Sequence, residues 1–489
     1  MKNWVSSHGL RFVAVFLAGM AVPLTNGIAQ TQPGFDESEA DRQKRLLEEQ
    51  ERAGVESRTV LPEAEDISYA DVLKDPDNID LNFRYAKAQV SRGNVRGAVS
   101  TLERILLITP DLPQVRLMYA IVLFRLDNID EAEREFNALK QLTMAASLEA
   151  EIDRYLGAIK KRRQTTTARV QVSVGVKRDS NVNAGPRSGQ ALGAGLLFAP
   201  TGRAQKQDDF AALGIVTANV TQDLGHQAPD KFLFSATYFH NEQMQIDPQD
   251  IQSGSASVAL KLNYEPFTMT PKITYTNLQL SREHFHSSWG AEVRFDRRNF
   301  LPNYGGIDGH FTLGVKDERF SPIFENGLGP ERDGQRVEAE FGLKKQFTPN
   351  HILAGTALYT RKLPYEKSFN GFRGHKVSLQ HTWLLGEGQF LLTGLDYATN
   401  LYKEPDPSVT AFQTRHDTQV RFRVTYGAPL SNFMSESYFG TEASKKYYDF
   451  LKDWTWTVTG EILDQGSNIP NFSYQNRRAQ TMLTRSWDF

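Results

Sequence analysis

The C-terminal part of the chain, from about residue 168 to residue 489, is a series of short segments in which apolar and polar residues alternate. The first segment alternates Val170, Val172, Val174 and Val176 with Arg169, Gln171, Ser173 and Gly175. Successive side chains of a β-strand point to opposite faces, so each segment has one apolar face and one polar face. Segments of about ten residues with this pattern are typical of strands that cross a membrane around a wet lumen. Soluble strands alternate as well, so alternation alone leaves a soluble sheet protein open.

Three further features favour a membrane barrel over a soluble sheet. The last segment carries Leu483, Arg485, Trp487 and Phe489 on one face and ends on that aromatic residue. The connections alternate between short and long. Aromatic residues stand at the ends of segments, as the interfacial girdles of membrane barrels require: Tyr264, Phe295, Tyr359, Tyr426, Trp454, Trp456 and Trp487.

The segments can be counted, and the count bears on the topology. We expect strands at 168–177, 209–221, 231–243, 252–264, 271–280, 286–297, 308–317, 334–347, 351–361, 374–384, 389–399, 414–427, 453–464 and 476–489. An even number suits a barrel whose two ends lie on the same side of a membrane. We therefore predict a C-terminal antiparallel transmembrane β-barrel of about fourteen strands, over residues 168–489.

The composition excludes several kinds of site, anchor and membrane segment. The chain has 489 residues, a formal net charge of −2 and no cysteine. The missing cysteine excludes disulfides, thiol catalysis, cysteine zinc sites and an N-terminal lipid anchor on this chain, and the near-zero charge predicts no nucleic-acid partner. Membrane helices need about 20 consecutive apolar residues, and no internal run of the sequence is that long. A membrane form of this chain must therefore be a closed barrel.

The N-terminus has the features of a secretory signal. Lys2 and Arg11 flank a polar start, residues 12–24 are apolar, and Gly27-Ile28-Ala29 supplies small residues for cleavage. A retained membrane anchor is the alternative, but the apolar stretch is short. We predict a signal peptide at 1–29, followed by a charged linker at 30–65.

Residues 66–163 have helical patterning and repeat themselves. Four residue types recur at a spacing of 34 (for example 120 minus 86): Pro76 with Pro110, Tyr85 with Tyr119, Ala86 with Ala120, and Ala98 with Ala132. That period, with small residues at two fixed helix positions, is typical of tetratricopeptide repeats. An ordinary helical bundle is the alternative. The overall prediction is an α+β multidomain chain, with an N-terminal α-helical tetratricopeptide-repeat domain before the barrel.

Repeat arrays of this kind present a concave groove to extended peptides or protein surfaces. Lys87, Ser91, Gln114 and Arg125 fall at groove-facing positions of the repeat. We expect a client protein to bind there, although exposed polar residues more often only face water.

Strand parity predicts which connections lie on which side. If the helical domain is periplasmic, residues 348–350 and 386–388 form tight periplasmic turns. The longer connections 178–208, 318–333, 362–373 and 400–413 then lie outside the cell. Residues 428–452 break the pattern, because they form a long segment on the periplasmic side. Either two strands have been missed or the segment is an insertion.

The sequence offers no constellation that demands catalysis. Ten histidines are scattered along the chain, and His284 and His286 lie near Ser287 and Ser288 without forming a spaced motif. Nucleophilic catalysis needs a nucleophile, a base and an orienting group brought together. We predict that the protein is not an enzyme and has no catalytic, cofactor-binding or metal-binding residues.

Two short blocks carry a family resemblance. The first, Asp179-Ser180-Asn181-Val182-Asn183, follows the first strand, and the second comprises Ser467-Asn468-Ile469-Pro470, Tyr474 and Asn476-Arg477. Together with repeats joined to a barrel, these blocks resemble the surface lipoprotein assembly modulator (Slam) family over roughly residues 66–489. The segment 428–452 departs from that family, where a short turn is expected.

The resemblance implies an outer-membrane translocon with its N-terminal domain in the periplasm. The implied clients are surface lipoproteins or related secreted haem- or iron-acquisition proteins. Further implied partners are outer-membrane lipid, and the barrel assembly machinery and periplasmic chaperones for its own insertion or for client delivery. An interior with charged positions suits passage of an extended chain: Arg169, Lys261, Arg294, Arg336, Lys344, Arg421 and Arg423.

The first and last strands must pair to close the barrel. Arg485 stands on the face that should meet lipid, where an arginine at the membrane midplane costs about 2–4 kcal/mol. The seam formed by Val172, Val174, Leu483, Arg485 and Phe489 is therefore our candidate for a lateral opening; the alternative is that Arg485 lies near the interface and snorkels. Other functions left open are a polysaccharide exporter and a passive porin with an accessory domain.

Overall fold

The computed structural model describes residues 67–142, 146–226, 229–322, 329–434 and 442–489. These residues divide into a helical unit that ends at Thr165 and a barrel unit that begins at Thr166. The predicted signal peptide (1–29) and linker (30–65) lie outside the described residues. Among the described helices, none is both long enough and apolar enough to span a membrane.

The helical unit repeats at the predicted interval. Its helices are α3 (Tyr69–Val72), α4 (Ile79–Ser91), α5 (Val95–Ile108), α6 (Pro113–Arg125), α7 (Ile129–Lys140) and α8 (Ala146–Arg163). α6 begins 34 residues after α4 (113 − 79), and α7 begins 34 residues after α5 (129 − 95). Asn78 and Asn94 cap α4 and α5 by accepting hydrogen bonds from Leu81 N and Gly97 N. Two helix pairs and a closing helix confirm the predicted tetratricopeptide-type array.

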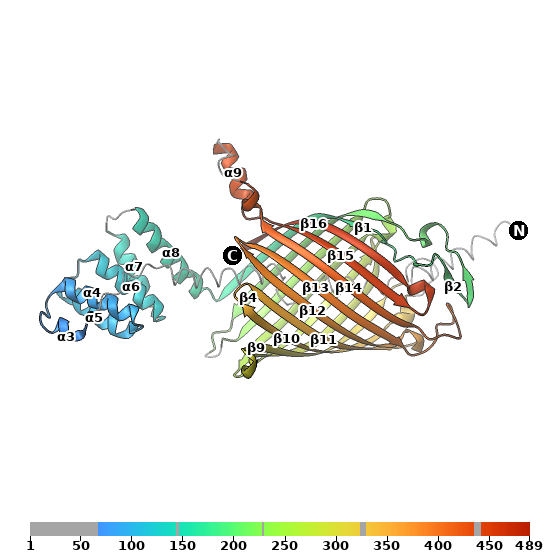
Figure 1. Cartoon of the computed structure of the whole chain (residues 1–489), viewed down its shortest axis with the longest axis horizontal. Helices are drawn as coiled ribbons and strands as arrows, with labels where there is room; N and C mark the ends of the chain where they lie inside the picture. The colour runs from blue at the N-terminus through green and yellow to red at the C-terminus, as the bar shows by residue number, and fades with distance from the viewer. Residues whose placement is uncertain (1–66, 143–145, 227–228, 323–328, 435–441) are drawn as a thin grey trace. The chain divides into compact units, whose positions relative to one another are not determined.

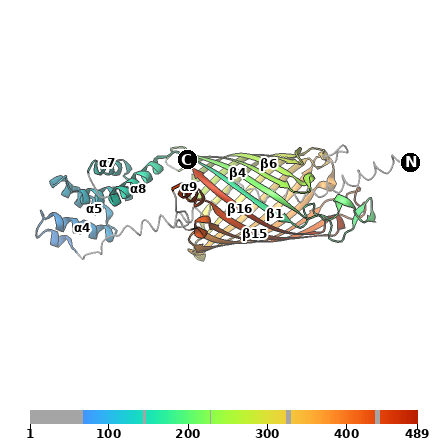
Figure 2. The same cartoon turned by 90° about the horizontal axis from the view of Figure 1, so that it is seen from above.

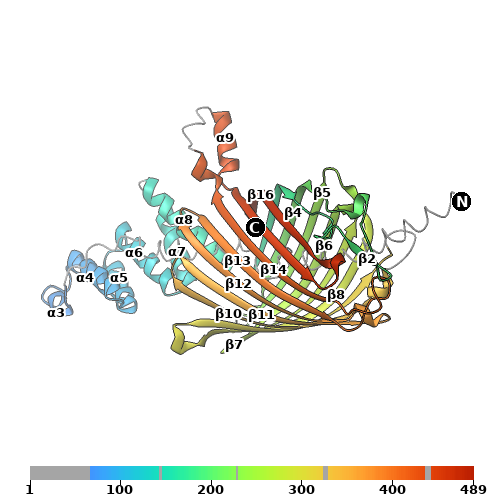
Figure 3. The ribbon, with the colours of Figure 1, turned by 45° about the vertical axis from the view of Figure 1, so that its right-hand side comes forward.

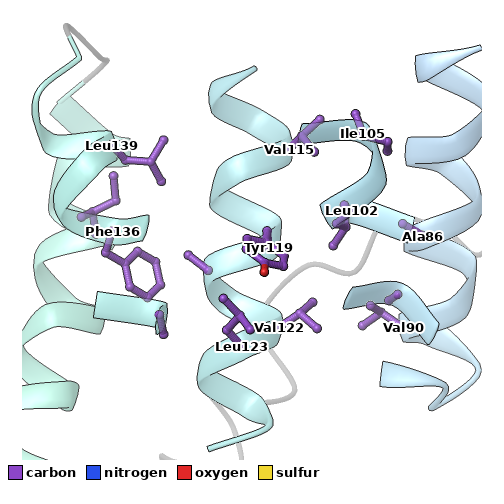
Figure 4. Packing of buried hydrophobic residues seen from close by; sticks show 14 of the residues in the cluster. Ala86, Val90, Leu102, Ile105, Val115, Tyr119, Val122, Leu123, Phe136 and Leu139 are labelled. Atoms are coloured by element: carbon purple, nitrogen blue, oxygen red, sulfur yellow. The ribbon is translucent and has the colours of Figure 1, made fainter. Parts of the chain in front are cut away.

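The repeated small residues explain the packing of the array. The four alanines at the repeating positions have no exposed surface: Ala86, Ala98, Ala120 and Ala132. Their missing side-chain bulk lets paired helices approach closely, and Leu102 and Phe136 belong to the same buried core (Figure 4). The ring of Phe136 stacks on Tyr155 of α8, with 5.0 Å between the ring centroids. α8 therefore covers the core at the end of the array.

The barrel unit closes on itself, as predicted. In the described part of the chain its fourteen strands are β1 (Thr166–Asp179), β4 (Asp209–Asp223), β5 (Lys231–Gln243), β6 (Ile251–Tyr264), β7 (Phe267–Leu280), β8 (Glu283–Leu301), β9 (Ile307–Phe320), β10 (Gly334–Thr348), β11 (His351–Pro364), β12 (Phe372–Gly386), β13 (Gln389–Tyr402), β14 (His416–Pro429), β15 (Thr455–Ser467) and β16 (Tyr474–Asp488). Each strand pairs antiparallel with the next, and β16 pairs with β1 (Figures 1 and 2). The strands run at a slant around the wall (Figure 3).

Each strand has an apolar outer face and a polar inner face. Exposed outward side chains include Val174, Val176, Ile273, Val377, Leu379, Val420, Phe422 and Ile462. Buried inward side chains include Gln171, Ser173, Thr217, Thr237, Arg421, Thr459 and Glu461. The two-residue period therefore reflects a surrounding apolar phase and a polar interior, as in outer-membrane-type barrels.

The connections differ at the two ends of the barrel. The terminal end is the one at which β1 begins and β16 ends, and its turns at Pro349-Asn350 and Glu387-Gly388 have two residues each. The opposite end, here called the loop end, carries most of the longer connections, and one of these contains the short hairpin of β2 (Ala191–Gly193) and β3 (Leu196–Phe198). Figure 1 shows β2 at the loop end of the barrel and the C-terminus at the other end.

The long segment at the terminal end is an insertion and not a pair of missed strands. Its described residues form the 3-10 turn η6 (Leu430–Phe433) and the helix α9 (Glu442–Leu451), and none of them is a strand. Leu430 N donates a hydrogen bond to Trp454 O, which ties the two ends of the segment together. The insertion spans β14 to β15 and leaves the strand count unchanged.

Candidate functional site

The predicted seam is a regular strand pair. Val172 lies opposite Arg485 and Val174 opposite Leu483 in the register of β1 and β16. Phe489 and Ala168 exchange two backbone hydrogen bonds of 2.8 and 3.1 Å (N to O). The ladder runs unbroken from Arg169–Asp488 to Asp179–Arg478, as long as the ladder between β15 and β16. The seam is therefore closed in this structure, and all five predicted seam residues lie along it.

The two sequence blocks of the family resemblance meet at the loop end of this seam. Ser180 N donates to Arg477 O (3.0 Å), and Arg477 N donates to the hydroxyl of Ser180 (2.8 Å). Asn476 Nδ2 donates to Asn181 O (3.1 Å), and Asn181 Nδ2 donates to Gln475 O (3.0 Å). Asn181 and Asn476 are each 1% exposed, so these bonds form inside the protein. Residues almost three hundred positions apart thus form one structural unit.

The first block also holds the start of the long loop after β1. The carboxylate of Asp179 accepts from Arg478 Nε (2.8 Å) and from Asn181 N (3.0 Å). Asn181 Oδ1 accepts from Gly185 N (2.7 Å), and Asn183 Oδ1 accepts from Gln207 N (3.0 Å). Short amide side chains that bond nearby backbone stabilise turns in this way. The block is a folded loop base.

The second block fixes the last loop and the β2–β3 hairpin. Asn468 Nδ2 donates to Thr414 O, and Asn468 Oδ1 accepts from His416 N, at 2.8 Å each. Ser467 Oγ accepts from Ile469 N (3.2 Å), and Pro470 begins the turn η8 (Pro470–Phe472). Asn471 of that turn exchanges two hydrogen bonds with the backbone of Leu192 in β2 (2.7 and 2.8 Å).

An apolar cluster holds the same loops together. Leu192 packs against Val409, Ile469 and Phe472. Gly195 N donates to Val409 O at 2.8 Å. The first long loop, the loop after β13 and the last loop therefore form a single packed layer at the loop end.

Arg485 does not meet lipid, which corrects the sequence-based expectation. Its side chain points outward as predicted but is only 14% exposed. The guanidinium donates to Phe450 O (3.0 Å) and pairs with Asp453 (3.1 Å). It also lies 4.7 Å from the ring centroid of Phe450 and 5.1 Å from that of Trp487. The insertion covers the cation, so the expected cost of a bare arginine does not arise and lends no support to a lateral opening.

The same insertion borders an apolar groove on the outer face of the seam. The groove has a volume of about 620 Å³ and is lined by Val174, Gly175 and Val176 of β1, Thr481, Met482 and Leu483 of β16, Trp456 of β15, and Leu430 and Phe433 of η6. The rings of Phe433 and Trp456 meet edge to face, with centroids 5.6 Å apart. η6 thus borders the outer side of the β1–β16 junction, and Phe450 of α9 contacts Arg485 of β16.

The four predicted groove residues of the helical array lie on α4 and α6. Lys87 Nζ stands 4.4 Å above the ring of Phe83, and the hydroxyl of Ser91 donates to Ala88 O (2.8 Å). Gln114 is exposed near the start of α6, and Arg125 is half-buried at its end. Their binding of a client stays a prediction.

Several residues that complete the junction escaped sequence reasoning. Arg478 was not singled out, although the two-residue period of β16 already placed it inward. Asp453 and Asn471 carried no detectable signal, because their partners Arg485 and Leu192 are brought near only by the folded insertion and the folded first loop.

Replacing Arg485 tests the contact with the insertion. R485M should lower the stability of the folded barrel by about 1–2 kcal/mol, because a partly desolvated cation–aromatic contact and an ion pair are lost. The shift is measured as the midpoint temperature at which the folded band disappears on a gel. R361M, which removes an exposed outward arginine of β11, is the matched control and should change little. Equal midpoints for both variants would mean that the insertion does not stabilise the seam.

Comparisons with known proteins give weak likenesses only. A scan with protein-family models finds no match. A search among curated proteins also finds none. Among solved structures, a loop-deletion mutant of OmpT, an outer membrane protein of Vibrio cholerae, is 8% identical, with a TM-score of 0.37 over 66% of this chain and 100% of that chain. OccAB4 of Acinetobacter baumannii is 7% identical, with a TM-score of 0.32 over 67% of this chain and 100% of that one.

The helical part has its own neighbour. The type III secretion chaperone SycD of Yersinia enterocolitica, solved with a peptide of the translocator YopD, is 15% identical. It covers 26% of this chain and 97% of its own, with a TM-score of 0.19. All these scores are too low to show a family. The assignment of a transmembrane barrel of the outer-membrane type rests on the closed sheet and its apolar exterior.

Proposed function

We propose that this chain is an outer-membrane translocon that delivers specific client proteins, surface lipoproteins or related secreted proteins, to the cell surface. The observation that carries the proposal is the joining, in one chain, of a tetratricopeptide-type array to a closed barrel with a polar inner wall. Arrays of this kind bind peptides and protein surfaces. A polar, charged wall suits an extended chain that must pass without being retained.

The proposed location follows from the same parts. Closed barrels with an apolar exterior are the β-structures that cross membranes. The array would lie in the periplasm, where a client arrives unfolded or bound to a chaperone. Client folding at the cell surface would make return unfavourable, because the folded client can no longer re-enter the lumen.

A lipid-anchored client adds a requirement for a lateral route. Acyl chains are apolar, and moving them along a charged wall would be costly. The junction of β1 and β16 is the proposed route, because the apolar groove lies on its outer face. In this scheme the closed ladder is the resting state, and the insertion flanks the point at which it would open.

Deleting the gene tests the translocon directly. Intact mutant and parent cells are shaved with protease, and the released surface proteins are compared by mass spectrometry. We expect one or a few proteins to disappear from the surface or the medium and to accumulate in the periplasm. An unchanged surface proteome would contradict the proposal.

A passive pore is the second candidate, and the polar inner wall favours it equally. It predicts steady ohmic conductance of the purified protein in planar bilayers and uptake of small solutes without any client. A conducting protein whose deletion leaves the surface proteome unchanged would fit this candidate.

A further inference from the structure

The inner wall of the barrel carries a row of charged side chains across four neighbouring strands. We call it the basic ladder: Arg421 and Arg423 of β14, Glu461 of β15, Arg478 of β16, and Lys177 and Asp179 of β1. Arg423 lies opposite Glu461, Glu461 opposite Arg478, and Arg478 opposite Asp179 in the strand registers. The row thus continues across the seam without a gap.

Cations outnumber carboxylates in this row. Glu461 pairs with both Arg423 (2.8 Å) and Arg478 (3.1 Å). Asp179 pairs with Arg478 (2.8 Å) and lies 3.9 Å from Lys177. Arg421 lies two residues from Arg423 and is 3% exposed. Within the described strands the ladder therefore has four cations and two carboxylates, a surplus of two positive charges.

Two of the four cations are much more exposed to the lumen than the carboxylates are, whereas Arg421 and Lys177 are more buried. The side chains of Arg423 and Arg478 are 34% and 26% exposed, whereas those of Glu461 and Asp179 are 7% and 3% exposed. The carboxylates therefore pair with these guanidinium groups on the side away from the lumen. The surface offered to the lumen is consequently cationic, with planar donors that match the geometry of a carboxylate.

Other cations of the inner wall are also held in ion pairs. Asp396 of β13 pairs with Lys376 of β12 at 3.4 Å and also lies opposite Arg421 in the register of β13 and β14. On the opposite wall Lys272 pairs with Glu292 (2.7 Å), and Lys316 pairs with Glu338 (2.8 Å). A second shared carboxylate, Glu318, holds Arg336 and Lys362, but their side chains are only 14% and 5% exposed.

We propose that the basic ladder is a binding site for carboxylate anions in the barrel lumen. A wall of one sign with low-dielectric surroundings concentrates counter-ions. The carboxylates could belong to small solutes or to acidic side chains of an extended polypeptide, and the chemistry of recognition is the same for both. The site does not depend on the translocon function, because a passive pore would use it equally.

The test measures binding of two probes to the purified full-length protein by calorimetry at low salt. Citrate represents a small solute, and a short polyglutamate peptide represents an acidic chain. R421Q/R423Q should weaken binding by about tenfold, the low end of what a one-signed cleft gains for its counter-ions. K272Q/K316Q removes the same charge from the opposite wall and should leave the affinity unchanged. E461Q raises the surplus to three and should tighten binding.

The two probes distinguish the sources of the carboxylate, and the variants test the site itself. Citrate binding alone assigns the site to small solutes, polyglutamate binding alone assigns it to extended chains, and binding of both supports both sources. No binding of either probe would overturn the proposal, as would equal weakening by K272Q/K316Q. If R421Q/R423Q does not fold, an unchanged affinity in E461Q overturns it by itself.

Discussion

A disulfide between the first and last strands is expected to stop delivery of lipid-anchored clients to the cell surface. The hydroxyl oxygens of Ser173 and Thr484 lie 2.8 Å apart on facing positions of β1 and β16. Two cysteines at such positions have the short Cβ separation that a disulfide needs. The chain has no cysteine of its own, so S173C/T484C forms the one possible bridge in an oxidising periplasm.

The measurement is protease shaving of intact cells with and without a reductant. We expect surface client to fall to the background of the deletion strain when S173C/T484C is oxidised, and to return on reduction. T425C/T459C is the matched control, because those hydroxyls also lie 2.8 Å apart but join β14 to β15. If the oxidised seam variant delivers its client normally, the seam stays shut during function. The translocon proposal would then stand without a lateral opening.

The barrel was predictable because lipid on the outside and water on the inside impose a period of two on the residues of its strands. Every expected segment became a strand, and the errors lie at the ends. β8 was expected at 286–297 and runs from Glu283 to Leu301, and β7 begins at Phe267 instead of 271. Beyond the apolar layer, alternation no longer separates inside from outside, so the sequence contains no signal for where a strand stops.

The repeat array was predictable for a different reason. Ala86, Ala98, Ala120 and Ala132 must be small because paired helices touch there, and that constraint repeats with the helices. The prediction that Arg485 meets lipid is wrong because the alternation of a strand does not distinguish lipid from other protein outside the barrel. The insertion places Phe450 and Asp453 there instead, and no local pattern shows where a folded insertion will lie.

The junction of the two sequence blocks was predictable only in part. Closure of an even-stranded barrel requires the first and last strands to be neighbours, so the loops that follow β1 and precede β16 must meet. That much follows from the strand count. The reciprocal bonds of Ser180 with Arg477 and of Asn181 with Asn476 depend on the exact register, which the alternation cannot specify.

Truncating Phe136 should unfold the helical array while leaving the barrel intact. Its side chain has no exposed surface and joins α7 to α8 through the ring of Tyr155, which also meets Phe124 edge to face at 5.4 Å. Replacing a buried phenylalanine by alanine costs about 3–5 kcal/mol. Domains have only about 5–15 kcal/mol of stability, so F136A should leave the array largely unfolded or close to it.

Limited trypsin digestion of the full-length protein separates the two units in one sample. In F136A we expect cleavage within residues 67–165 at a temperature at which the unaltered protein resists, while the folded barrel band on the gel is unchanged. L107A is the matched control, because Leu107 lies in the same array but is 79% exposed, and truncating it should cost little. Equal protease resistance of F136A and L107A would contradict the packing described for α7 and α8. Under the translocon proposal, F136A should also retain its client in the periplasm. If trypsin cleaves the array of purified F136A and cells carrying F136A still deliver the client normally, the barrel acts without a folded array.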